Sequence, residues 1–306
     1  MRRHTPIAAA LAAGALGLVA AGCGQSSTGG GGGGPTIVAT TSVLGDVARQ
    51  LTGGLAEVQV LVPAGADPHE LQPSARQAVA LREADLVVAN GGGLEAGLAD
   101  TIDTARADGA PVFEAIDHVD ALDAASGDGV DPHFFTDPAR MADAAEALAG
   151  VLAAEVPALD DEAFREAAGA YVAQLRELDT EVEATLVAVP PDRRTLVTTH
   201  DVLGYFADRY GFEVVGTVVP SATTQAAASA AAIDELAAIV EEAGVPTVFA
   251  DTSAPADLAD ALADEVGGVS VVELYSESLG GPGSGADTYE GMVRTNADRI
   301  AGALAP

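Results

Sequence analysis

Short apolar segments that alternate with helical patterns are the feature that most constrains the fold of this chain. The segments are rich in β-branched residues, are bounded by Gly, Pro or Asp, and occupy residues 36–41, 58–62, 86–89, 112–115, 195–199, 213–219, 247–251 and 269–274. The stretches between them, among them 43–51, 72–83 and 226–243, show helical patterns. Strands that alternate with helices favour βαβ units and mostly parallel sheets. Because the strand segments are continuously apolar, we expect helices on both faces of each sheet.

One long helical pattern separates the first four strand segments from the last four. Pro157 precedes this pattern and Pro190 ends it. Its apolar stripe consists of Phe164, Ala168, Tyr171, Leu175, Leu178, Val182 and Leu186. A helix of this length measures about 40 Å. We therefore predict an α/β protein of two similar lobes with mostly parallel sheets flanked by helices: an N-terminal lobe at 36–159, a linking helix at 160–190 and a C-terminal lobe at 191–306.

The N-terminus has the layout of a secretory signal peptide over residues 1–22. Arg2 and Arg3 precede an apolar stretch, which gives way to small residues. That stretch is too short for an ordinary membrane-spanning helix. Cys23 is the single cysteine, and its setting after Ala-Ala-Gly resembles the lipobox of bacterial lipoproteins, where the cysteine is lipidated. Ala20 stands where that motif usually has Leu, so a secreted protein with an incidental cysteine remains the alternative.

Residues 23–35 form a Gly/Ser-rich tether.

The charge of the whole chain limits the kinds of partner that the protein can bind. The sequence holds 46 acidic residues against 14 basic ones, a formal net charge of −32. All basic residues are Arg, scattered singly or in pairs, so there is no basic patch for phosphate backbones and we expect no nucleic-acid partner. With 48% hydrophobic residues, the chain is too apolar for a disordered acidic protein.

Three histidines lie where parallel α/β sheets place their ligands. His69 belongs to GADPHELQP after the second strand segment, His133 to DPHFFTDP, and His200 follows TLVTT directly. Ligand sites of open α/β sheets lie beyond the carboxyl ends of strands, and three imidazoles with one carboxylate can complete a tetrahedral zinc site. Taken singly, a histidine in a Pro-flanked turn is more often a loop or capping residue. His118 is interpreted in that way.

From about residue 37 to 304 the chain resembles the metal-binding receptors of bacterial zinc and manganese ABC transporters. The segments that carry the resemblance are TTSVLGDVARQL, GADPHELQPSARQ, LREADLVVANGGGLE, DPHFFTDP, LVTTHDVLGYFADRYG and SESLGGPGSGADTYEGMVRTNADRI. The resemblance implies a two-lobed α/β fold with a rigid linking helix. It also implies one metal ion buried between the lobes and passed to a membrane permease.

Matched position by position, His69, His133 and His200 correspond to the family's metal ligands. The fourth ligand of the family is usually an Asp in a D-S-L or D-S-I motif, and Glu277 in SESLG stands at the matching place. Its additional methylene moves the carboxylate outward, so Asp251 or a water molecule remains an alternative fourth ligand. The other role open to Asp251 is to cap the turn at Thr252 and Ser253.

The ligand set implied by the resemblance favours Zn²⁺ over Mn²⁺ as the bound ion. Manganese-type members tend to have Glu where this chain has His200, and three nitrogens with one carboxylate suit zinc better. We expect a monomeric, non-enzymatic receptor that is lipid-anchored at the outer face of the bacterial cytoplasmic membrane and works with a permease.

The alternatives are a manganese receptor of the same type, a zinc hydrolase and a surface adhesin. A hydrolase would keep an open metal position and use Glu70 or Asp201 as a base. The sequence has neither an HExxH helix nor a nucleophile elbow, which counts against this alternative.

Overall fold

The computed structural model describes residues 34–306, except for 126, 128, 220–223, 225–229 and 254–256. The expected signal peptide, Cys23 and nearly all of the tether therefore lie outside the described residues. Within the described ranges, no helix is both long enough and apolar enough to cross a membrane.

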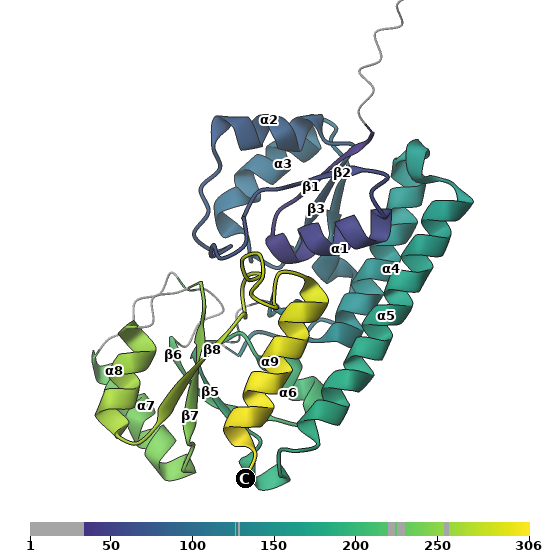
Figure 1. Ribbon diagram of the computed structural model, residues 1–306. Helices are drawn as coiled ribbons and strands as arrows, with labels where there is room; N and C mark the ends of the chain where they lie inside the picture. The colour runs from purple at the N-terminus through teal and green to yellow at the C-terminus, as the bar shows by residue number, and fades with distance from the viewer. Residues whose placement is uncertain (1–33, 126, 128, 220–223, 225–229, 254–256) are drawn as a thin grey trace, which may run out of the picture. The chain divides into compact units, whose positions relative to one another are not determined.

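The N-terminal lobe is built on a parallel sheet of β1 (Thr36–Ala39), β2 (Glu57–Val60), β3 (Leu86–Ala89) and β4 (Val112–Glu114). The strand order is β2-β1-β3-β4. Side chains alternate between the two faces. Ile37 and Val88 pack in the core with helices α1 (Ser42–Thr52) and α4 (Pro138–Glu155), whereas Val38 and Val87 pack with α2 (Ala75–Glu83) and α3 (Ala99–Ala107). Helices thus cover both faces, as Figure 1 shows.

The C-terminal lobe repeats this arrangement with β5 (Thr195–His200), β6 (Glu213–Val219), β7 (Thr247–Asp251) and β8 (Ser270–Leu274). These strands are parallel in the order β6-β5-β7-β8. Val197 and Val248 pack with α7 (Ala230–Ala243) and α8 (Asp257–Val266). On the opposite face lie α6 (Gly204–Tyr210) and α9 (Tyr289–Leu304). The predicted fold, two α/β lobes with parallel sheets, is confirmed.

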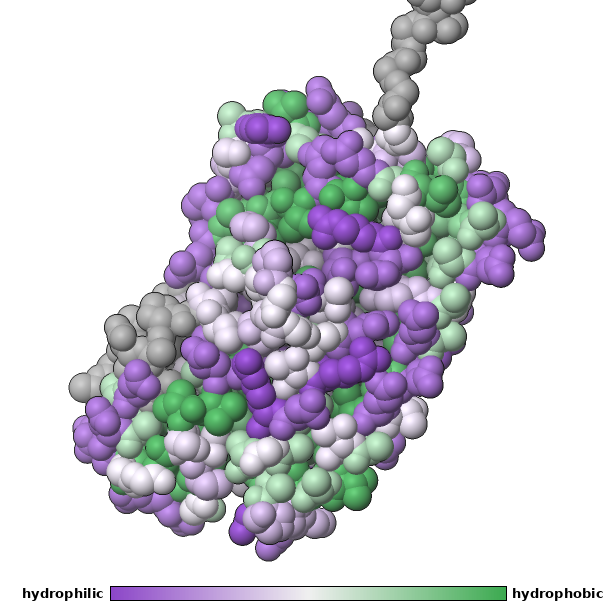
Figure 2. All heavy atoms as spheres, in the orientation of Figure 1, coloured by the Kyte–Doolittle hydropathy of each residue, from purple (hydrophilic) through white to green (hydrophobic). Residues whose placement is uncertain are grey.

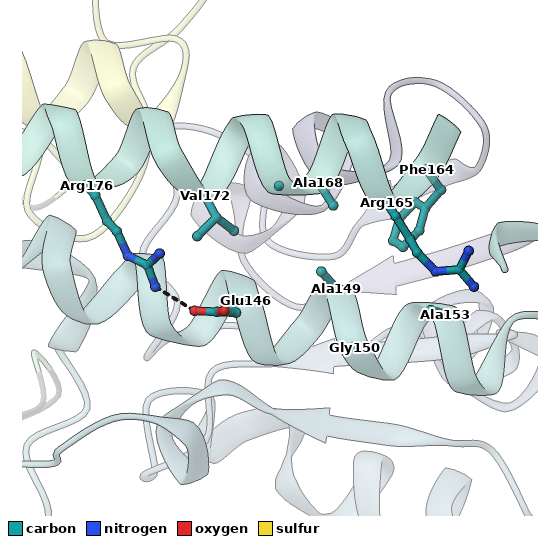
Figure 3. Close-up of a pocket in the computed structure, with 10 residues that line it drawn as sticks. Glu146, Ala149, Gly150, Ala153, Phe164, Arg165, Ala168, Val172 and Arg176 are labelled. Carbon is teal, nitrogen blue, oxygen red and sulfur yellow. Dashed lines mark hydrogen bonds and ion pairs between the residues drawn. The ribbon is translucent and has the colours of Figure 1, made fainter. Parts of the chain in front are cut away.

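Helix α5 (Glu162–Leu186) lies between the two sheets in the sequence and packs against both lobes through α1 and α9. Asp161 caps its first turn by accepting a hydrogen bond from the Phe164 amide. Every member of the predicted apolar stripe is buried. Figure 3 shows α5 alongside α4, with the Arg176–Glu146 ion pair between them. The two helices flank a hollow of about 350 Å³, and small residues such as Ala149 and Ala168 line it.

The predicted bounds of several elements differ from the observed ones: β1 ends at Ala39 and not at residue 41, β2 is Glu57–Val60 in place of 58–62, and α5 is Glu162–Leu186 within the predicted 160–190. The helical pattern at 72–83 begins only at Ala75, because Ser74 forms a capping box with Gln77. Helix α7 is observed from Ala230, and residues 226–229 of the predicted helix lie outside the described residues. These shifts leave the order of the strands and helices as predicted.

Hydrophilic residues cover much of the face seen in Figure 2, with smaller hydrophobic areas between them. The side chains of the four candidate ligands are buried, and Glu277 is the single acid among them. Most of the negative charge therefore has no part in that site and solvates the protein instead.

Candidate metal centre

The four candidate ligands come from strand ends and the loops beyond them in both lobes. His200 ends β5 and Glu277 lies just beyond β8, whereas His69 follows β2 and His133 precedes the short 3-10 helix Phe134–Thr136. All four are buried, with exposed fractions of 2% or less. One possible ligand atom from each lies within 4.8 Å of the others. The structure therefore brings these four residues together in one cluster.

The Glu277 carboxylate lies at the centre of this cluster. Its Oε1 is 2.6 Å from His200 Nε2 and 3.2 Å from His133 Nε2, and its Oε2 is 3.6 Å from His69 Nε2. The Nε2 atoms of His69 and His133 are 3.5 Å apart. Zinc–nitrogen bonds of about 2.0–2.1 Å place tetrahedral ligands about 3.3 Å apart. Most of these spacings are thus close to those of a tetrahedral shell.

Both Asp-Pro-His segments form turns in which the aspartate accepts a hydrogen bond from the histidine amide. The distances are 2.8 Å from His69 N to Asp67 Oδ1 and 3.0 Å from His133 N to Asp131 Oδ1. Asp131 Oδ1 also lies 2.7 Å from His133 Nδ1. Because a carboxylate accepts the Nδ1 proton, Nε2 is the nitrogen of His133 that faces the cluster, as in carboxylate-oriented metal ligands.

Buried charges shift the pKa values of this cluster in opposite directions. Burial opposes a charge on His133, but the Glu277 carboxylate and the hydrogen bond to Asp131 raise the pKa of its imidazole to about 10. Burial likewise opposes a charge on Glu277, but His133 and hydrogen bonds from the histidines hold the pKa of Glu277 well below its usual value. A metal ion bound by His133 would have to displace a proton from it, because metal ligands must be deprotonated.

Asp251 lies outside the cluster and supports the loop that carries Glu277. Its Oδ1 accepts a hydrogen bond from Ser253 N at 2.6 Å, and its Oδ2 accepts bonds from Ser276 N at 3.1 Å and Ser276 Oγ at 2.5 Å. The turn at Ser253 was expected from the sequence. The contact with Ser276, the residue before Glu277, was missed, and only its proximity to a candidate ligand hinted at it.

The remaining residues singled out from the sequence lie away from the cluster or at its edge. His118 is exposed and stacks on Phe113 at 4.6 Å. Glu70 is exposed. Asp201 is buried and follows His200 in the sequence. Its burial is the main cause that raises the pKa of its carboxyl group, and the negative charge of Asp131 is the second. Sequence reasoning also missed the supporting roles of Asp67 and Asp131, although both precede a Pro-His pair.

Comparisons with known proteins agree with this architecture. Residues 37–303 match the family model described as zinc-uptake complex component A, periplasmic. The chain is 30% identical over 292 residues to the manganese-binding lipoprotein MntA of Halalkalibacterium halodurans, covering 94% of this chain and 95% of that protein. It is 32% identical over 282 residues to the zinc-binding protein TroA of Treponema pallidum, covering 89% of each.

A solved structure of TroA from Treponema pallidum superposes with a TM-score of 0.80 at 31% sequence identity, covering 90% of this chain and 100% of that one. The matches therefore extend over both lobes and over α5. Relatives named for zinc and for manganese occur together among them.

Proposed function

Because the chain belongs to the family of periplasmic component A proteins of zinc-uptake complexes, we propose that it is an extracytoplasmic receptor that binds Zn²⁺ and delivers it to an ABC permease. The protein is a metal ABC transporter substrate-binding protein, and its relatives include zinc and manganese binders. The ion is its cargo. The observation that carries the proposal is the buried group of four ligand atoms, contributed by both lobes, within 4.8 Å of one another.

In this proposal His69, His133 and His200 bind the ion through Nε2, and Glu277 completes the shell. Zinc is favoured over manganese because three imidazoles and one carboxylate form a nitrogen-rich set. Glu277 supports this assignment since its two oxygens already face all three imidazoles. Asp251 is not proposed as a ligand because both of its oxygens accept hydrogen bonds from serine residues.

The test is elemental analysis of the purified protein, followed by titration of the chelator-stripped protein with Zn²⁺ and Mn²⁺ against a competing chelator. We expect tighter binding of Zn²⁺. His200→Ala is expected to weaken Zn²⁺ binding by orders of magnitude, whereas the matched control His118→Ala, at the exposed histidine, keeps wild-type affinity. A stripped protein that binds neither ion tightly would contradict the receptor function, and full affinity in His200→Ala would contradict the ligand assignment.

Glu277→Gln tests the fourth ligand separately. The amide keeps one oxygen but loses the charge, so we expect weaker binding of Zn²⁺ than in the wild-type protein. The control is Glu70→Gln, which makes the same change at an exposed position outside the cluster. Full affinity in Glu277→Gln would point to Asp251 or a water molecule as the fourth ligand.

The domain organisation and the membrane attachment complete the proposal. It assigns residues 1–22 to a signal peptide, 23–35 to a tether, 36–159 and 191–306 to the two lobes and 160–190 to the linking helix, and it has the protein working as a monomer. Cys23 is proposed to carry the lipid that holds the receptor at the outer face of the bacterial cytoplasmic membrane, as expected of a relative of lipoproteins. Mass spectrometry of the membrane fraction tests this, because Cys23→Ser should release the protein unlipidated.

A zinc hydrolase is less well supported by the same residues. In the proposed site four side chains take the tetrahedral positions, whereas a catalytic zinc site keeps one position for water. Glu70, one of the two bases considered, is exposed. The family comprises transporter substrate-binding proteins, so we propose no catalytic residues.

A further inference from the structure

The segment that carries Glu277 is held at its two ends by different lobes. On one side Ser276 is bound through both its amide and its hydroxyl to Asp251, at the end of β7 in the C-terminal lobe. On the other side the residues after Glu277 are bound to the N-terminal lobe. Ser276, Glu277, Ser278 and Asp251 are all at most 3% exposed. Glu277 is therefore the single residue between two buried anchors.

The anchor on the N-terminal lobe consists of two facing hydroxyls. Ser42 Oγ, at the start of α1, lies 3.0 Å from Ser278 Oγ and accepts a hydrogen bond from Leu279 N at 3.1 Å. Gly65 N donates to Ser278 Oγ at 2.9 Å and to Leu279 O at 3.0 Å. We call Ser42 and Ser278, with these bonds, the serine latch. In Figure 1 the loop between β8 and α9 lies beside α1, which agrees with these contacts.

The side chain of Glu277 spans the boundary that the serine latch closes. Its carboxylate meets His200 from its own lobe and His69 and His133 from the other. A glutamate has more rotatable bonds than an aspartate, so a backbone that also moved would add to the freedom that its carboxylate loses on binding. The serine latch fixes that backbone relative to the lobe that supplies two of the three imidazoles.

We propose that Ser42 and Ser278 are positioning residues that determine how long the metal ion is retained. The proposal rests on the metal-receptor function above. In this proposal the Glu277 carboxylate is the first ligand to leave the ion when the lobes separate locally. The latch slows this step because it holds Glu277 against His69 and His133. Opening of the latch then frees the ion without any change in the histidines.

The experiment measures the rate at which the protein, loaded with Zn²⁺ or Co²⁺, releases the ion to an excess of chelator. Ser42→Ala and Ser278→Ala should each release the ion between about fivefold and about tenfold faster, the effect of losing about one net hydrogen bond. Because the two residues share one hydrogen bond and each makes another of its own, the double variant should release the ion faster than either single variant, but by less than the product of the two single effects. The Co²⁺ absorption spectrum should stay close to wild type, since all four ligands remain.

Ser270→Ala is the matched control. It removes a hydroxyl pair of similar length, Thr247–Ser270 at 2.9 Å, which joins β7 to β8 away from Glu277, although Ser270 is exposed and the latch serines are buried. Thermal melting of the metal-free proteins shows whether a variant has merely lost stability, and Ser270→Ala should release the ion at the wild-type rate. Wild-type release rates in both latch variants, or equal acceleration in Ser270→Ala, would overturn the latch and leave the receptor function standing. A wild-type protein that takes up no metal would overturn both.

Discussion

The two Asp-Pro-His turns have the same three residues but different surroundings. In both, the aspartate accepts a hydrogen bond from the histidine amide, so the motif produces the same backbone turn twice. At His133 the same carboxylate oxygen also binds the ring Nδ1 at 2.7 Å. At His69 the second oxygen of Asp67 instead accepts a hydrogen bond from Thr224 Oγ1 at 2.6 Å. One aspartate orients its histidine, and the other connects its turn to the C-terminal lobe.

The turn at His133 is also more deeply built into the protein. Asp131 O accepts a hydrogen bond from Tyr205 Oη at 2.6 Å, and Pro132 O accepts one from Asn90 Nδ2 at 2.9 Å. Asp131 is buried, whereas Asp67 is only half-buried. A short motif can thus set the same backbone turn twice, whereas distant residues such as Tyr205 and Asn90 decide how firmly each turn is held. Substitutions at equivalent positions of the two turns should therefore have unequal effects.

The largest effect is expected for Asp131→Ala. The variant loses the acceptor that orients His133 together with the cap of its turn, and loss of such outer partners weakens metal binding by about 10- to 100-fold. We expect a value near the upper end, measured by competition for Zn²⁺ with a chelator. The control is Asp161→Ala, which removes an amide-capping aspartate at the start of α5, away from the cluster. Equal losses in Asp131→Ala and Asp67→Ala would show that the two turns do not differ in the way described.

Asp67→Ala should have a smaller effect, about tenfold or less, because it removes a turn cap and a contact with the C-terminal lobe. The same competition assay measures it. Asp67→Asn separates these roles, since the amide oxygen can still accept the His69 N–H. If Asp67→Asn binds Zn²⁺ as weakly as Asp67→Ala, the charge of Asp67 matters and not the turn.

The strands and the long helix could be predicted from the sequence because their signals are local. Short runs rich in β-branched residues mark the eight strands, and the stripe from Phe164 to Leu186 marks α5. The meeting of His69, His133 and His200 was not predictable from spacing, since it depends on how the strand ends of two lobes face each other. It was the resemblance to a family that gave the expectation. That the four residues bind metal stays a prediction.

The supporting residues were harder to predict because their signals are not local. Asp251 and Ser276 are 25 residues apart, and Ser42 and Ser278 are 236 apart. Serine and aspartate are common in turns for local reasons, so their presence in the sequence does not indicate a distant partner. Only the packed structure shows which of them lie beside Glu277.

Tyr205→Phe tests the support of the His133 turn without touching its aspartate. The hydroxyl donates to Asp131 O and accepts from Leu122 N at 3.0 Å. Its loss should destabilise the protein by about 1–3 kcal/mol, because buried groups lose their partner, and weaken Zn²⁺ binding by about threefold. Thermal melting and the competition assay measure these effects. The matched control is Tyr171→Phe, because the Tyr171 hydroxyl is buried without a hydrogen-bond partner among the described residues. If Tyr171→Phe lost as much Zn²⁺ affinity as Tyr205→Phe, the Tyr205 hydroxyl would not be a specific support of the His133 turn.

Thr224→Val should have the smallest effect. It removes the hydroxyl that donates to Asp67 Oδ2, but Asp67 is half-buried and water can replace the donor. The turn keeps its bond from the His69 amide, so Zn²⁺ affinity should fall by no more than about threefold. The control is Thr180→Val, at an exposed hydroxyl on α5.

In Asp67→Ala the hydroxyl of Thr224 has no carboxylate to bind, so adding Thr224→Val to that variant should change nothing further. A loss from Thr224→Val as large as that from Asp131→Ala would instead make the bond between the lobes, and not the orientation of His133, the main support of the site.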